Sequence, residues 1–384
     1  MSIYGSVGDH AEWIVPELSS GTVWLVGVLL FVAGVIMTAG GAGGGSVFVP
    51  ILIGVGCLET HQAIPLSKFV IFAGSVCSYI LLTVHTWQTH HTSIIDFGLV
   101  RAIVPMSLAG TLIGVALNVL LSSEVLLILL SCLLTVLFVK SAMLSIDKYR
   151  QDKLAEVEPV LVVATPTEEV ERKDDVSLKI SADDMVSLIP SSQKGFWSST
   201  TGQNWLMASL VPLSIVCGFT SKLDGVPLYG EIILLIVPIV ACICVTWFFH
   251  TIEPRIGIAY PLVGLLAGIS SGLFGLGGGV IYSPFLLHAK LKPAVAVAVS
   301  TTCVFFASAS STFQYVFMGR ISILFGLFYS CFAIAASVVA QKLIWLITEK
   351  LRRPFYIFCL VTAIIGSSLA FTIAKSIMIS QDNT

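Results

Sequence analysis

Residues 33–50 read AGVIMTAGGAGGGSVFVP, and residues 267–284 read AGISSGLFGLGGGVIYSP. A single offset of 234 positions aligns the two glycine triplets and the proline that ends each stretch. The same offset continues further along the chain, where it places Ser67 on Thr301. Repetition at one constant spacing indicates a structural unit that is present twice. The chain is therefore predicted to consist of two related halves.

The composition indicates a membrane protein. Of the 384 residues, 56% are hydrophobic and only 11% are charged, and the mean hydropathy is +0.96. A soluble domain usually carries about 25% charged residues. The net charge of −2 gives no indication of a nucleic-acid-binding surface. The nine cysteines are irregularly spaced within apolar runs, which is not the pattern of a disulfide framework or a zinc site, so no metal or cofactor is expected.

Apolar runs that approach the length of a membrane span cover most of the chain. About 20 apolar residues are needed to cross a bilayer as a helix, and the runs predict an all-α polytopic membrane protein with about 10–12 membrane segments. The glycine triplets interrupt two of these runs, so each run is expected to form two shorter helical pieces. The predicted organisation is a first membrane repeat over 1–145, a polar cytoplasmic loop over 146–204, two extra spans over 205–256 and a second membrane repeat over 257–384.

The distribution of lysine and arginine predicts how the halves are oriented. These residues favour the cytoplasmic side of a membrane. The central polar loop contains many of them, whereas residues 1–20 contain acidic residues and no lysine or arginine. Counting spans from an inside loop makes the two glycine-rich hairpins open to opposite sides. The two repeats are therefore predicted to have inverted topology.

The glycine triplets are predicted to break helices inside the membrane. A break leaves backbone groups without partners, which is tolerated only inside protein or beside a wet cavity. The half-helix that follows presents free N–H groups and its positive dipole end, a combination that suits an anion. Paired breaks in inverted repeats indicate a transporter site near the middle of the membrane. Glycine clusters that serve close helix packing are the alternative interpretation.

Lys68 is the charged residue at membrane depth that stands out most. Such charges are expensive to insert and usually functional. We interpret it as a fixed positive charge that holds an anion beside a glycine-rich break. The alternative is a lysine that extends to the membrane surface or pairs with Glu59.

Hydroxyl side chains after each break complete the predicted site. Ser67 and Thr301 are the preferred pair because they match across the repeat, although serines and threonines in membrane helices often bond their own backbone. The candidate substrate-binding residues are Gly43, Gly44, Gly45, Ser46, Ser67, Lys68, Gly277, Gly278, Gly279, Ser300, Thr301 and Thr302. Ser75, Ser78, Ser308 and Gln314 are further candidate donors.

A histidine-rich segment follows the first candidate site. We interpret His85, His90 and His91 as part of a solvated loop, because their spacing is not a usual ligand pattern. A proton remains the candidate coupling ion, through these histidines or Asp96.

The repeated motifs resemble a known family. The stretches GLFGLGGGVIYSP (272–284) and VAVSTT (297–302), with the looser first copies GGAGGGSVFVP (40–50) and AIPLSK (63–68), are similar to the signature of the TauE/SafE sulfite exporter family. The long central loop resembles that of the eukaryotic branch. The resemblance implies export of sulfite, an organosulfonate or a related sulfur oxyanion, with a small anion and the lipid bilayer as partners.

Other function classes are weighed against this one. The sequence contains no nucleophile–base or metal-binding motif at membrane depth, so an enzyme is not expected. An anion channel would share the broken helices, and a non-transporting receptor or scaffold could act through the central loop. The expected location is the plasma membrane, with multiple passes.

Overall fold

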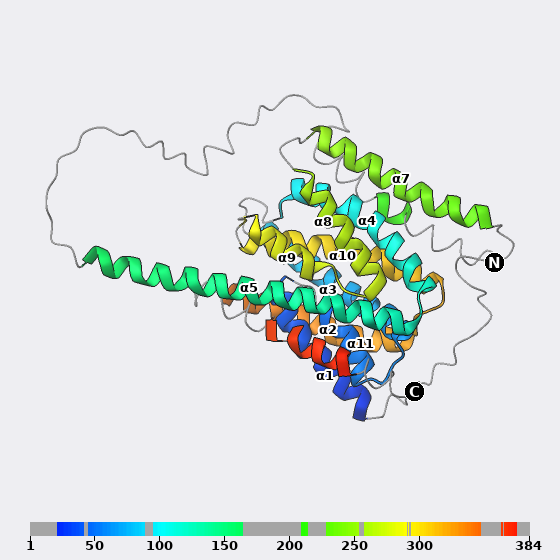
Figure 1. Ribbon diagram of the computed structural model, residues 1–384, viewed down its shortest axis with the longest axis horizontal. Coiled ribbons are helices and arrows are strands. Elements are labelled where there is room, and N and C mark those ends of the chain that lie inside the picture. The colour runs from blue at the N-terminus through cyan, green and yellow to red at the C-terminus, as the bar shows by residue number, and fades with distance from the viewer. Residues whose placement is uncertain are drawn as a thin grey trace.

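The computed structural model describes residues 21–41, 45–88, 95–163, 209–213, 228–252, 257–289, 291, 293–346, 362–363 and 365–374. Within these ranges the regular structure is entirely helical. The labelled helices are α1 (Gly21–Ala39), α2 (Gly45–Gly54), α3 (Thr60–Gln88), α4 (Phe97–Leu120), α5 (Ser123–Val163), α7 (Leu228–Ile252), α8 (Ala259–Phe274), α9 (Gly279–His288), α10 (Pro293–Phe317) and α11 (Ile323–Leu346) (Figure 1). The prediction of an all-α protein is confirmed.

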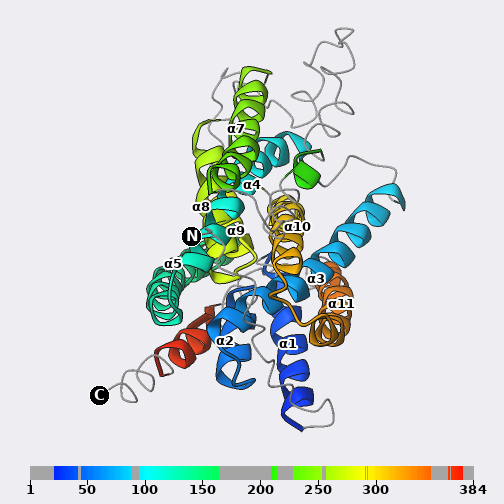
Figure 2. The same ribbon diagram turned by 90° about the vertical axis from the view of Figure 1, so that its right-hand side faces the viewer.

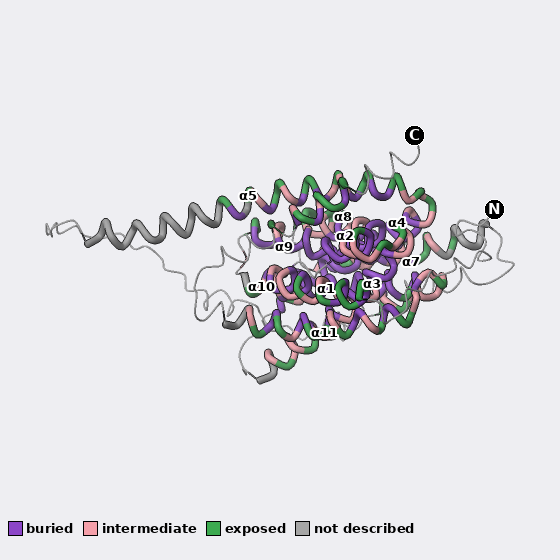
Figure 3. Tube along the Cα trace, turned by 90° about the horizontal axis from the view of Figure 1, so that it is seen from below, coloured by how far each residue is buried: buried purple, intermediate pink, exposed green. Residues whose placement is uncertain are grey.

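Seven of the described helices are long and apolar enough to cross a membrane, namely α1, α3, α4, α5, α7, α10 and α11. Among them α4 and α10 are the most deeply buried, whereas α5 and α7 turn much of their surface outward (Figure 3). The outward faces carry large apolar side chains such as Ile128 and Ile236. Apolar side chains on the outside are stable against lipid rather than water, so the protein is an integral multi-pass membrane protein.

Helix α5 is longer than the sequence analysis predicts. It continues to Val163 and projects beyond the helical bundle (Figure 1). Its second part is therefore helical where a polar loop was predicted from residue 146 onwards. Lysine, arginine, glutamine and glutamate are frequent there, and all four are good helix formers despite being polar. The rest of the predicted loop, over 164–204, lies outside the described residues.

The two halves are interleaved rather than placed side by side as separate bundles. Helix α4 of the first half packs along α8 of the second, and α11 of the second half packs along α1 of the first. Helix α3 lies against both α10 and α11 (Figure 2). Each half therefore completes its packing with helices of the other half.

Small residues allow the closest of these helix pairs to form. A methyl group added to Gly268 of α8 would collide with the carbonyl oxygen of Ser107 in α4, and one added to Gly110 would collide with that of Leu265. Close approach through small residues is the usual way in which membrane helices associate. The glycines within α8 thus serve packing, which separates them from the glycines at the helix break.

Candidate functional site

Each half contains one helix break at the predicted position. Helix α1 ends at Ala39 and α2 begins at Gly45, while α8 ends at Phe274 and α9 begins at Gly279. The bounds of α2 and α9 differ by the offset of 234 found in the sequence. The prediction that each glycine-rich run forms two shorter helical pieces is confirmed.

The backbone conformation repeats as well. Gly41 has a φ of 73° and Gly275, its equivalent in the second half, has a φ of 70°. This left-handed conformation is accessible to glycine at little cost. Each of these two glycines lies two residues before the first glycine of the triplet in its half. They are the positions at which the chain leaves each helix.

Each break is held by a hydroxyl group from the other half. The Ser300 Oγ on α10 donates a hydrogen bond to the Gly41 carbonyl oxygen at 2.7 Å. The Ser67 Oγ on α3 lies 3.3 Å from the Gly275 carbonyl oxygen, a longer contact than its 2.8 Å hydrogen bond to the Ile64 carbonyl oxygen in its own helix. Reciprocal contacts of this kind are expected where two similar units face each other across a two-fold axis.

The second break also binds the side-chain nitrogen of Lys68. Lys68 is completely buried, and its Nζ donates to the Leu276 carbonyl oxygen at 2.8 Å and to the Ser271 Oγ. Glu59 is exposed and is not its partner, so pairing with Glu59 and extension to the surface are both wrong. The side chain therefore links α3 of the first half to the break of the second half.

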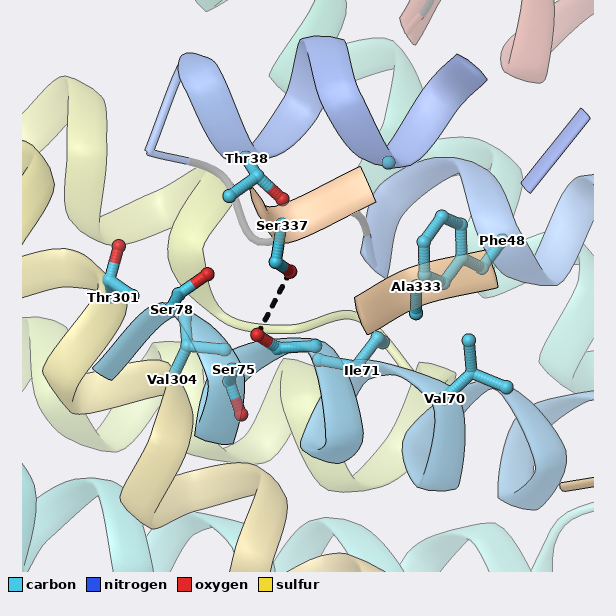
Figure 4. Close-up of a pocket in the computed structure, with 12 residues that line it drawn as sticks. Thr38, Phe48, Val70, Ile71, Ser75, Ser78, Thr301, Val304, Ala333 and Ser337 are labelled. Carbon is cyan, nitrogen blue, oxygen red and sulfur yellow. Dashed lines mark hydrogen bonds between the residues drawn. The ribbon is translucent and has the colours of Figure 1, made fainter. Parts of the chain in front are cut away.

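A cavity lies beside the first break, between helices of both halves. It is small, with a volume of about 20 Å³, and it is partly open to its surroundings. Figure 4 shows hydroxyl side chains gathered at one end and Phe48, Val70 and Ala333 at the other. The lining residues are Gly34, Thr38, Phe48, Val70, Ile71, Gly74, Ser75, Ser78, Thr301, Val304, Ala333 and Ser337. No lining residue carries a formal charge.

Three of the hydroxyl groups at this cavity make no hydrogen bond within the described part of the chain. The Ser78 Oγ is buried and has no hydrogen-bond partner, and the side chains of Thr38 and Thr301 make no hydrogen bond to any residue that the structure describes. By contrast, the Ser337 Oγ donates to the Gly74 carbonyl oxygen at 2.9 Å (Figure 4). Buried polar groups are almost always hydrogen-bonded. Unused hydroxyls that face a cavity indicate that a ligand or water occupies it.

The predicted site residues divide between these features. Thr301 lines the cavity, Ser300 holds the first break, and Ser67 and Lys68 contact the second break. The Thr302 Oγ1 instead donates to the Ala298 carbonyl oxygen in its own helix at 2.8 Å and does not line the cavity.

The predicted glycines and Ser46 lie at the breaks themselves. Gly45 begins α2 and contacts the backbone of Gly277, so the two breaks adjoin. Gly278, with a φ of 72°, and the buried Gly279 form the start of α9. Ser46 is completely buried at the start of α2, and its hydroxyl has no partner among the described residues.

Some predicted residues lie outside the described ranges or have structural roles. Gly43, Gly44, His90 and His91 are outside the described residues. His85 is half-buried in α3, so the prediction that it belongs to a solvated loop is wrong. Asp96 accepts hydrogen bonds from the Gly98 and Leu99 backbone nitrogens and so caps the start of α4.

Thr38, Phe48 and Ser337 line the cavity but are not among the residues predicted from the sequence. The sequence could have indicated Thr38, since it is a hydroxyl residue directly before the first break. No sequence pattern indicates Ser337, because it belongs to a helix that the repeat does not place at this break.

Comparison with known proteins agrees with the sequence resemblance. Residues 23–172 and 182–366 match the profile of the family described as "Sulfite exporter TauE/SafE". Sulfite exporter TauE/SafE family protein 2 of Arabidopsis thaliana is 25% identical, over 89% of this chain and 80% of its own length. Family protein 1 of the same plant is 27% identical over 79% of this chain and 72% of its own length. Family protein 3 is 25% identical over 95% of this chain and 80% of its own length.

No solved structure matches the chain. The profile covers most of the two membrane halves, including both helix breaks and the helices that line the cavity. Members of this family are membrane transporters and not enzymes. The chain belongs to the TauE/SafE sulfite exporter family.

Proposed function

We propose that this transporter exports a small anion and binds it in the cavity beside the first helix break. The anion is sulfite, an organosulfonate or a related sulfur oxyanion. The observation that carries the proposal is the set of unused hydroxyls of Thr38, Ser78 and Thr301 at one cavity. An oxyanion accepts several hydrogen bonds at once, so three free donors at one end of a cavity suit it.

The helix break adds a favourable electrostatic environment. Phe48, in the first turn of α2, lines the cavity, so the start of this helix lies at the cavity wall. The first turn of a helix has unpaired N–H groups and a partial positive charge. This supports binding of an anion without a charged side chain in the cavity lining.

The opposite end of the cavity supports an organic group on the anion. Phe48, Val70 and Ala333 provide an apolar surface there. In a conformation in which the cavity is wider, a sulfonate would place its oxygens at the hydroxyl end and its carbon atoms against this surface. Sulfite would use the hydroxyl end alone.

The cavity is lined by helices from both halves of the protein, which supports transport by alternating access. Helices α1, α2 and α3 come from the first half, and α10 and α11 from the second. With inverted repeats, rocking of one half against the other would expose the cavity alternately to each side of the membrane. We propose the plasma membrane as the location, which a fluorescent fusion would test.

The test is efflux of radiolabelled sulfite and of ethanesulfonate from proteoliposomes. Thr301→Val and Ser78→Ala should each raise the KM about tenfold, as expected when a buried hydrogen bond of about 1.4 kcal/mol is lost. Thr246→Val is the matched control, because the Thr246 Oγ1 donates only to the Cys242 carbonyl oxygen within α7. Equal KM values in the control and the Thr301 variant would contradict the site.

The same assay distinguishes the alternative functions. Saturable flux that is accelerated by substrate on the opposite side indicates a transporter, and flux without either property indicates a channel. Absence of flux for every sulfur oxyanion would contradict the proposed cargo. Full flux after deletion of residues 156–194 would contradict a receptor that acts only through that segment.

A further inference from the structure

The two helix breaks are occupied differently. A cavity with unused hydroxyls lies beside the first break, whereas the second break is filled by large side chains. Among the residues that the structure describes, Tyr282, Tyr315 and Lys68 are the three largest side chains that are fully buried, and all three lie at the second break. Tyr282 lies against Gly278, and the Tyr315 hydroxyl donates to the Gly272 carbonyl oxygen at 2.7 Å.

Lys68 is held there only by neutral oxygen atoms. Its Nζ donates to the Leu276 carbonyl oxygen, in the segment between α8 and α9, and to the Ser271 Oγ, in the last turn of α8. In the part of the chain that the structure describes, no carboxylate pairs with it. The C-terminal end of α8 contributes a partial negative charge to the same place.

These groups form the kind of site that binds a small cation. Hydroxyl and carbonyl oxygens are the ligands that hard cations prefer. Unwound carbonyls and helix C-terminal ends coordinate the coupling cations of many secondary transporters. In this chain the lysine ammonium group occupies that position.

The sequence of the first break differs at the positions equivalent to Ser271 and Lys68. Met37 stands where the second half has Ser271, and Thr302 stands where the first half has Lys68. Met37 provides no oxygen ligand, and the Thr302 hydroxyl is used within its own helix. The difference is specific to the second break and is not a general property of the repeat.

We propose that the second helix break is a cation site that Lys68 occupies permanently. The site takes a monovalent cation through oxygen ligands, and the tethered ammonium group replaces a dissolved one. The chain therefore supplies its own cation and needs no sodium ion at this break. The role in transport rests on the proposed anion export, whereas the cation site itself does not.

The site is tested first by binding, independently of any cargo. Purified Lys68→Ala retains the Ser271 and Leu276 oxygens but lacks the ammonium group. Its thermal midpoint should rise with sodium chloride relative to equal choline chloride, because a ligand that binds only the folded state stabilises it. The wild-type midpoint should show no difference between the two salts.

Two further variants locate the effect. Lys68→Ala/Ser271→Ala lacks one ligand and should lose the sodium response. Lys68→Ala/Ser270→Ala is the matched control and should keep it, because the Ser270 Oγ donates to the Leu266 carbonyl oxygen within α8. An equal sodium response in both double variants, or none in folded Lys68→Ala, would overturn the proposal.

Flux then tests the role of the cation. In choline buffer, anion efflux by Lys68→Ala should fall at least tenfold, and sodium should restore at least half of it. Lys68→Met fills the space without a charge, so it should stay inactive in both buffers. If Lys68→Met transports the anion at the wild-type rate, the volume of the side chain and not its charge is what the break requires, and the proposal is overturned. If wild type itself carries no sulfur oxyanion, the thermal measurements still decide the cation site.

Discussion

Gly45 and Gly277 meet backbone to backbone where the two helix breaks adjoin. A methyl group added to Gly45 would collide with the backbone nitrogen of Gly277. One glycine of each triplet, 232 positions apart in the sequence, thus takes part in a single contact between the two halves. Because the obstacle is backbone, it cannot move aside as a flexible side chain would.

Gly45→Ala should therefore prevent normal folding. We expect a large loss of monodisperse protein after detergent extraction and a lower thermal midpoint for what remains. Gly257→Ala is the control, because nothing lies within 4 Å of a methyl group added there. Indistinguishable yields and midpoints for the two variants would contradict the contact.

Ser300→Ala should weaken the first break without closing the cavity. It removes the hydrogen bond from the Ser300 Oγ to the Gly41 carbonyl oxygen. Hydrogen bonds between membrane helices contribute on average about 0.6 kcal/mol and at most about 1.7 kcal/mol. The free energy of unfolding, measured by titration with a denaturing detergent, should fall by an amount in this range. Ser311→Ala is the control, since the Ser311 Oγ bonds only carbonyl oxygens of α10.

Ala333→Leu should block transport by filling the cavity. Ala333 lies at the apolar end of the cavity, away from the unused hydroxyls (Figure 4). The added carbon atoms would occupy the space of the anion's organic part, so efflux of ethanesulfonate should fall more than efflux of sulfite. Ala335→Leu, on the exposed face of the same helix, should transport both normally. Equal loss in both variants would indicate a general effect on α11.

Gly268→Ala should separate α4 from α8. The added methyl group would collide with the Ser107 carbonyl oxygen, and these two helices join the two halves of the protein. The thermal midpoint should fall by several degrees. Leu266→Ala, on the exposed side of α8, should leave it nearly unchanged. An unchanged thermal midpoint for Gly268→Ala would contradict the close packing of α4 against α8.

Asp96 provides a test of proton coupling against a structural role. As the cap of α4, Asp96→Ala should cost about 1 kcal/mol of unfolding free energy, whereas Asp96→Asn should keep the cap. If capping is the whole role, Asp96→Asn retains both stability and pH-dependent flux. Loss of flux in a stable Asp96→Asn protein would instead indicate that the carboxyl group takes part in transport.

Much of the fold could be predicted because it depends on local sequence. The apolar runs predict the spans, and the glycine-rich stretches predict the breaks near Gly41 and Gly275. The helical second part of α5 was missed, because polarity was interpreted as a loop although the residues are good helix formers. Inverted orientation of the two repeats remains a prediction.

The sequence by itself therefore determined the membrane class, the two-fold repetition and the positions of the breaks, because these are set by composition, spacing and the conformational freedom of glycine. Only the tertiary structure decided which residues meet at each break. It brings Ser300 to the first break and Lys68 to the second, and it brings Thr38, Ser78 and Thr301 to one cavity. The physical reason is that interleaved helices exchange partners between the halves, and such contacts leave no local pattern in the chain.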